Sequence, residues 1–239
     1  MEVHHHALTS RKKWTHYLWE FLMLFLAVFC GFLAEYKLEH LIEHTKEKEY
    51  MRSMVEDLAQ DTIEINRVTI SLGASRLGLD TLLNLLESGV YSDSGDLKKM
   101  YRIHFADAGY VPAILSQRTL SQLKNAGGLR LIQHKSIADT ISVYDTKSQQ
   151  LALTQKSFDE ISTQVYLKGA EIFDSRYYRK YIVTGDVKLL TADARILRPY
   201  ANHLFMDQAI NEYYGKKLAE QKGLAIDLIR SIREKYHHK

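Results

Sequence analysis

The chain has 239 residues, a formal net charge of +3, two prolines and 12 glycines. This length leaves room for one domain with a substantial core after a tail and an anchor are set aside, and the scarcity of Pro and Gly favours long helices. The single cysteine, Cys30, excludes an intrachain disulfide, whereas so small a net charge excludes no class of partner.

Residues 1–13 form a polar tail that contains three consecutive histidines and the basic cluster Arg11, Lys12 and Lys13. Three histidines can bind a transition metal weakly. Ordering a flexible tail costs conformational entropy, however, so a simple polar tail is the favoured interpretation.

Residues 14–34 are predicted to form a transmembrane helix. The run from Phe21 to Ala34 has no charged residue but is only 14 residues long, whereas a span needs roughly 20. Residues 17–19 extend the run to 18 positions with one carboxylate inside, and three aromatic residues suit the belt at a membrane interface: Trp14, Tyr17 and Trp19. Because basic residues stay inside, the cluster before the helix predicts a cytoplasmic tail and an extracytoplasmic location for everything after Glu35.

Removal or lipidation of this segment is not favoured. A lipoprotein signal ending at Cys30 would have Phe29 where a small residue is needed, and the exit sequence 32–34 lacks the small residue of a signal-peptidase site. The anchor is therefore expected to be retained.

One face of the anchor carries Glu20, Ala27, Gly31 and Ala34, because steps of seven, four and three residues return to the same side of a helix. Small residues four apart let two helices approach closely, so this face is a predicted interaction surface, with coincidence among small residues as the alternative. Glu20 either reaches to the cytoplasmic boundary or pairs with a partner inside the membrane.

No Gly or Pro occurs between Ala34 and Gly73, which predicts that the span continues as a helical stalk. From residue 51 the apolar positions alternate in steps of four and three, as in a helix packed within a bundle. His40 and His44 have the i, i+4 spacing of a zinc site on a helix. Two ligands do not complete such a site, so a solvated stalk face is the alternative.

Further helices are predicted at about 77–87, where Ser88-Gly89 ends the helix, and at about 97–105, 136–181 and 203–236, with a short segment ending near Pro199. Thr119 is expected to cap or open another helix, which residues 125–128 stop through a left-handed residue. The expected fold is all-α: residues 35–239 form an extracytoplasmic bundle of four or more long elements.

Charge is unevenly distributed along this domain. Residues 35–67 carry nine acidic against five basic residues, and residues 215–239 carry seven basic against three acidic. The basic C-terminal helix is therefore expected to return toward the acidic stalk or anionic lipid, with two independently solvated faces as the alternative.

Catalytic motifs are missing from the sequence: it has no Gly-x-Ser-x-Gly elbow, His-Glu-x-x-His helix or phosphate-binding Walker loop. We expect no enzymatic activity and no cofactor. Asp57, Asp61 and Glu64 share a helix face and are interpreted as solvent-facing carboxylates. Paired tyrosines near Arg176 and Arg179 suit packing better than stacking on nucleic acid, so no nucleic-acid partner is expected.

Three stretches carry a resemblance to a known group: MEVHHH at the N-terminus, EFLMLFLAVFCGFLAE over 20–35 and LSQLKNAGGLRLI over 120–132. They resemble helix-rich, single-pass membrane proteins of Bacteroidota, most strongly over 1–65 and 115–145. The resemblance implies an inner-membrane location, a periplasmic domain and a native histidine tail. It implies no activity and no catalytic residue.

These features lead to two functional hypotheses. The first is a non-enzymatic membrane protein, embedded in the lipid bilayer, whose helical domain serves as an envelope interaction, scaffold or accessory subunit. Its partner would be another protein or a second copy. The second is a periplasmic ligand sensor that signals through a separate partner, because a 13-residue tail cannot form an output domain.

Overall fold

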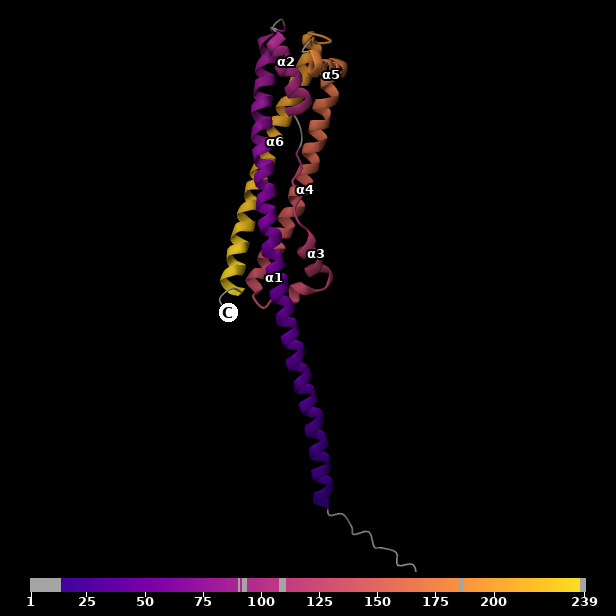
Figure 1. Ribbon diagram of the computed structural model, residues 1–239, viewed down its shortest axis with the longest axis vertical. Helices are drawn as coiled ribbons and strands as arrows, with labels where there is room; N and C mark the ends of the chain where they lie inside the picture. The colour runs from indigo at the N-terminus through magenta and orange to yellow at the C-terminus, as the bar shows by residue number, and fades with distance from the viewer. Residues whose placement is uncertain (1–13, 90, 92–93, 108–110, 185–186, 237–239) are drawn as a thin grey trace, which may run out of the picture. The chain divides into compact units, whose positions relative to one another are not determined.

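The computed structural model describes residues 14–89, 91, 94–107, 111–184 and 187–236 (Figure 1). The described elements are helices, and the one extended pairing among these residues is an isolated antiparallel bridge between Phe173 and Leu189. The all-α prediction is confirmed. Contacts between residues divide the chain into two units, Met1–Glu49 and Tyr50–Lys239, and each is described separately.

Helix α1 (Trp14–Ser88) is a single helix of 75 residues, so the prediction of a separate helix from about residue 77 is wrong. Gly73 does not interrupt it, because Leu72 and Leu79 on either side are buried and hold the helix in the bundle. Gly89 follows with a φ of +66°, a left-handed conformation that suits glycine and ends the helix where the Ser88-Gly89 pair predicts.

The second element of the Tyr50–Lys239 unit is interrupted. It consists of α2 (Ser94–Arg102), the π-helical turn η1 (Ile103–Asp107), an extended segment over 111–117 and α3 (Arg118–Asn125). Figure 1 shows α2 and α3 at opposite ends of this unit. Gly127, with a φ of +64°, confirms the left-handed stop, and the short 3-10 helix η2 (Gly128–Leu131) follows.

Helix α4 (Lys135–Gly169) ends well before Tyr181, so the predicted single helix over 136–181 is wrong. After Gly169 the chain turns a corner, and α5 (Ser175–Thr184) begins. The Gly169 carbonyl accepts hydrogen bonds from the N–H groups of Ile172 and Phe173, which places both side chains in the core. Burial of these two side chains stabilises the corner against a continuous helix.

Helix α6 (Ala194–Tyr236) includes Pro199, contrary to the prediction that a segment ends there and a helix begins at about 203. Proline removes only one hydrogen bond this near a helix start. Asp193 caps the helix, because its side chain accepts from the N–H of Arg195 and its carbonyl from that of Leu197. Burial of Leu197 and Tyr200 anchors the first turns.

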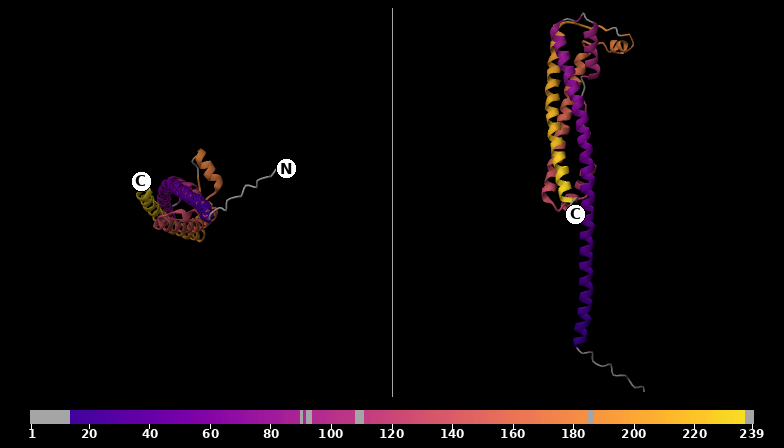
Figure 2. Two further views of the ribbon diagram at one scale, coloured as in Figure 1. Left: turned by 90° about the horizontal axis from the view of Figure 1, so that it is seen from below. Right: turned by 60° about the vertical axis from the view of Figure 1, so that its left-hand side comes forward.

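Three apolar clusters follow one another along the second unit. The Ser88-end cluster joins Leu82, Tyr101, Phe173 and Tyr200, and the central cluster joins Ile65, Ala113, Phe158 and Tyr214. The Met51-end cluster joins Met54, Leu120, Ile141 and Leu228. Because α1 contributes to all three, it runs the full length of the core, with α6 antiparallel beside it (Figure 2).

The C-terminal end of α6 lies at the start of the second unit, since Leu228 and Ile232 share the Met51-end cluster. Its basic side chains Lys216, Lys217 and Arg230 form ion pairs with acidic residues of α6 itself. Pairing of this basic end with the acidic residues 35–67 or with lipid stays a prediction.

Replacement by alanine is expected to change the free energy of unfolding in opposite directions at two glycines. A Cβ at Gly73 would meet nothing within 4 Å, so Gly73→Ala should raise the free energy of unfolding by about 0.5–1 kcal/mol through helix propensity. A Cβ at Gly169 would lie 2.5 Å from His104 Nε2 and nearer still to Cε1 of the same ring. Gly169→Ala should therefore lower the free energy of unfolding by about 1–3 kcal/mol. Urea unfolding of both variants tests the pair, and equal effects would contradict the described packing.

Candidate functional site: the apolar segment of α1 and the polar interior of the bundle

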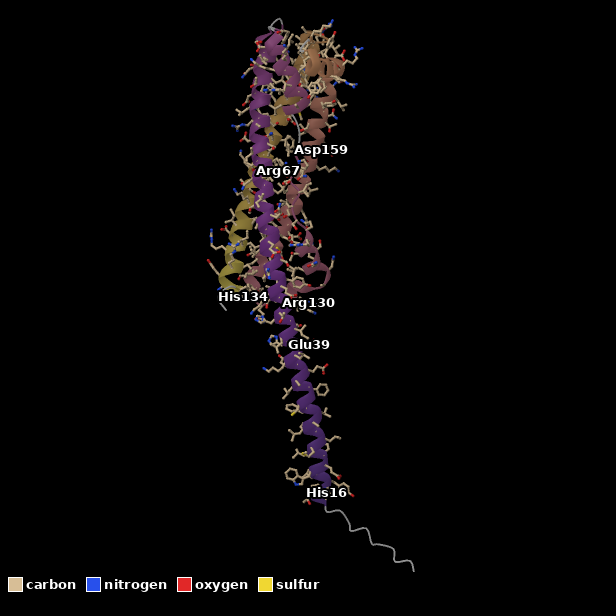
Figure 3. The ribbon with its side chains drawn as sticks, in the orientation of Figure 1. His16, Glu39, Arg67, Arg130, His134 and Asp159 are labelled. Carbon is tan, nitrogen blue, oxygen red and sulfur yellow. The ribbon has the colours of Figure 1, made fainter. Side chains whose placement is uncertain are left out.

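The first unit presents an apolar surface. Every residue from 14 to 43 is exposed, including the large apolar side chains between Phe21 and Leu33. In the part of α1 near His16, side chains project from more than one side of the helix (Figure 3). Within the part of the chain that the structure describes, α1 is the one helix long and apolar enough to cross a membrane.

The predicted anchor face is accessible along this helix. Glu20, Ala27, Gly31 and Ala34 are all exposed, and a Cβ on Gly31 would meet nothing within 4 Å. Glu20 Oε1 lies 3.4 Å from Nε2 of His16, one turn earlier. Arg11, Lys12 and Lys13, on which the orientation depends, lie outside the described residues, as does the rest of the 1–13 tail.

The histidine pair of the stalk gains no third ligand. His44 Nδ1 lies 3.2 Å from Oε2 of Glu47, and the ring of His40 lies 6.4 Å from that of Tyr36. Among the described residues there is no group of three or more His, Cys, Asp or Glu side chains placed to hold a metal ion.

The carboxylate row of α1, defined as Asp57, Asp61 and Glu64, faces the extended segment 111–117 and the start of α3. The interpretation of these carboxylates as solvent-facing is wrong for Asp57 and Asp61, which are buried. Each member of the row accepts a backbone N–H, from Thr119, Ser116 and Ile114 in turn. Asp61 and Glu64 therefore replace the helical partners that the extended segment lacks, and Asp57 pairs with an N–H of the first turn of α3.

Asp61 is the most enclosed member of the row, with 1% of its surface exposed. Its Oδ1 accepts the N–H of Ser116 at 2.7 Å, and its Oδ2 accepts the hydroxyl of Tyr144 on α4 at 2.6 Å. Burial raises the pKa of Asp61, although both of these hydrogen bonds act in the opposite direction. Burial, aided by the charge of Asp61, also raises the pKa of Tyr144.

Asp57 and Glu64 are held in their charged forms. Burial alone would raise the pKa of Asp57, but hydrogen bonds from the Thr119 side chain at 2.5 Å and backbone at 3.0 Å outweigh it, so this pKa is lowered. Arg67 donates two hydrogen bonds of 2.8 Å to Glu64 and lowers the pKa of this carboxyl to about 2. Arg67 also reaches the carbonyl of Pro112 at 3.3 Å and is labelled in Figure 3.

Other polar groups lie inside the bundle, and the periodicity of the sequence did not reveal them. Gln221 of α6 donates to Ser148 Oγ of α4 at 2.7 Å, and Ser162 donates to the buried Asp207 at 2.5 Å. His104 of η1 is buried among aromatic rings. The core is therefore apolar in layers that are separated by hydrogen-bonded groups.

A pocket of about 600 Å³ opens between the end of α1 and the start of α6. Leu86, Leu197 and Phe205 form part of its apolar lining, and Glu87 and Arg198 bring charges of both signs to it. Such a lining suits a small ligand with an apolar body and a polar group.

Comparison with known proteins finds no matching family model, curated protein or solved structure. Inferences about function therefore rest on the residues of this chain.

The carboxylate row should be essential to the fold. Asp61→Ala removes the acceptor of two buried donors, the Ser116 N–H and the Tyr144 hydroxyl, and should lower the free energy of unfolding by about 2–4 kcal/mol. Glu56→Ala, on the exposed side of the same turns, is the matched control and should change it by less than about 0.5 kcal/mol. Urea unfolding measures both, and a small effect at Asp61 would refute the assigned role.

Proposed function

We propose that this chain is a non-enzymatic, single-pass membrane protein that acts in the bacterial envelope as an interaction, scaffold or accessory subunit. The observation that carries the proposal is that the exposed apolar segment 14–34 and the central helix of the bundle belong to one helix, α1. A continuous helix joins the anchor to the folded unit without a flexible linker.

The proposed location is the inner membrane, with the tail in the cytoplasm and the bundle in the periplasm. Arg11, Lys12 and Lys13 support this orientation through the preference of basic residues for the cytoplasmic side. Exposed Trp14 and Trp19 suit the interface at that end of the span.

The proposed partner is a second copy or another envelope protein, contacted through the face of Glu20, Ala27, Gly31 and Ala34. Lipid tails are as apolar as leucine, so helices associate in a membrane by close packing, for which exposed Gly and Ala are suited. On the same face, the carboxylate of Glu20 adds a polar group whose pairing would strengthen such a contact.

Oxidative cross-linking at Cys30 in native membranes tests self-association. We expect a disulfide-linked dimer, and Gly31→Leu should reduce its yield several-fold because the larger side chain separates the helices. Phe29→Leu, on the opposite side of the helix, is the control and should leave the yield unchanged. No dimer under any oxidant, together with a monomeric detergent particle, would contradict association between copies and leave a different protein as the partner.

The alternative is a periplasmic sensor that passes a signal to a separate partner. The observation that favours it is the pocket between α1 and α6, because Leu86 and Glu87 of its lining belong to α1, the helix that also contains the apolar segment 14–34. Thermal-shift screening of the full chain in detergent is the test. A metabolite that raises Tm for the wild type but not for Phe205→Ala would favour sensing, since Phe205 lines the pocket.

A further inference from the structure

His104 occupies an aromatic enclosure at the Ser88 end of the bundle. Only 2% of its surface is exposed, and its ring is stacked between Phe173, at 4.6 Å between centroids, and Tyr166, at 5.6 Å. Phe105 and Tyr200 meet it edge-on. The residue sits on the π-helical turn η1, a distortion that is frequent at functional positions in helices.

The two ring nitrogens of His104 differ in their hydrogen bonding within this enclosure. Nδ1 lies 3.0 Å from the hydroxyl of Tyr200 on α6, which serves as its hydrogen-bond partner. Nε2 is buried and has no hydrogen-bond partner among the residues that the structure describes. A neutral imidazole can leave one nitrogen as an unused acceptor, but an imidazolium has two N–H donors and would leave one of them unpaired.

Gly169, the last residue of α4, closes the space in front of Nε2. A Cβ on Gly169 would lie 2.5 Å from that nitrogen, so neither a side chain nor an acceptor group fits between them. The carbonyl of Gly169 is already used by the N–H groups of Ile172 and Phe173, which form the corner between α4 and α5. The ring of His104 therefore packs directly on the backbone that turns this corner.

We propose that His104 is an acid-sensitive latch, which in its neutral form holds η1 against the corner between α4 and α5 and which releases that corner when the imidazole is protonated. The neutral ring stacks on Phe173 and lies against Gly169 without needing a second hydrogen bond. The charged ring needs an acceptor for Nε2–H, and opening of the corner admits the water that provides one.

No charge opposite to that of an imidazolium faces the ring in the part of the bundle described here. From α4 it meets the Tyr166 ring, and from α6 the Tyr200 hydroxyl. Asp174 at the corner is bound by Arg176, and Asp207, whose charge acts on Tyr200, is bonded to Ser162. Protonation would thus place an uncompensated charge in an apolar site.

The sign of the response follows from burial. Burial lowers the pKa of His104 to about 4 in the closed state, whereas the imidazole in an opened corner regains its ordinary value of 6.5. The opened state therefore binds the extra proton as pH falls below 6.5. The free energy that favours the closed state then decreases progressively down to pH 4. Between pH 7 and pH 5 the opening equilibrium should rise by roughly 20-fold.

Hydrogen exchange of the full chain in detergent, corrected for intrinsic exchange rates, tests the latch. We expect peptides that cover 103–107 and 165–173 to lose about 20-fold in protection between pH 7 and pH 5, while peptides that cover 51–58 keep theirs. His104→Phe retains an aromatic ring without a titratable group and should abolish this pH response. His134→Phe is the matched control, because His134 meets the ring of Tyr236 edge-on at the other end of the unit.

The variants separate the latch from general loss of structure. His104→Gln, which is polar but does not titrate, serves if His104→Phe does not fold, and it should also show no pH response in these peptides. Gly169→Ala should open the corner at both pH values alike. Equal protection of the wild type at pH 7 and pH 5, or an unchanged response after replacement of His104, would overturn the proposal.

Discussion

The fold depends on the capture of backbone donors by the carboxylate row of α1. Pro112 cannot continue a helix, and the second element of the bundle is extended from there to α3. An extended segment packed against other helices has no backbone partner for its N–H groups, and each one left unpaired costs about 1–3 kcal/mol. Asp61 and Glu64 of the neighbouring helix supply acceptors to Ser116 and Ile114 of this segment. Asp57 supplies one to the N–H of Thr119 in the first turn of α3, which also lacks a partner within its helix.

The same interaction fixes the register of the bundle. The three carboxylates recur at steps of four and three, so they form a row on one side of α1, and the extended chain passes along it. Tyr144 joins α4 to this row through Asp61, and Gln221 joins α6 to α4 through the Tyr144 carbonyl at 3.3 Å and Ser148. A slip of α1 by one turn would break these directional bonds together, whereas apolar contacts alone tolerate such shifts.

The sequence predicted the features that depend on local chemistry. The left-handed residue Gly127 and the stop at Ser88-Gly89 follow from glycine in a position that other residues avoid, and both are confirmed. The all-α fold follows from long helical periodicity and few breaking residues. These signals involve neighbours in sequence, so they can be recognised without knowing what packs against them.

Features that depend on distant contacts were predicted wrongly or not at all. Carboxylates four and three apart look the same on a solvated face and on a face that binds an extended chain, so the burial of Asp57 and Asp61 could not be inferred from spacing. The start of α5 did leave a signal: Asp174-Ser175-Arg176 has the same pattern as Asp193-Ala194-Arg195 before α6. In both, Asp caps the helix and the Arg side chain binds the Asp carboxylate.

The two ends of the second unit differ in how their cores are built. The Met51-end cluster is formed mainly by regular helices, and α1, α4 and α6 all contribute to it. The Ser88-end cluster gathers the π-turn, the corner after Gly169 and the short α5, which are joined by Tyr101 through its bonds to Lys188 and Asp174. Short elements bury less apolar surface and have fewer internal hydrogen bonds, so local opening requires less free energy there than in the long helices. A conformational response of the bundle is therefore expected to begin at the Ser88 end and to reach the other two clusters through the long helices α1, α4 and α6, which contribute to all three clusters.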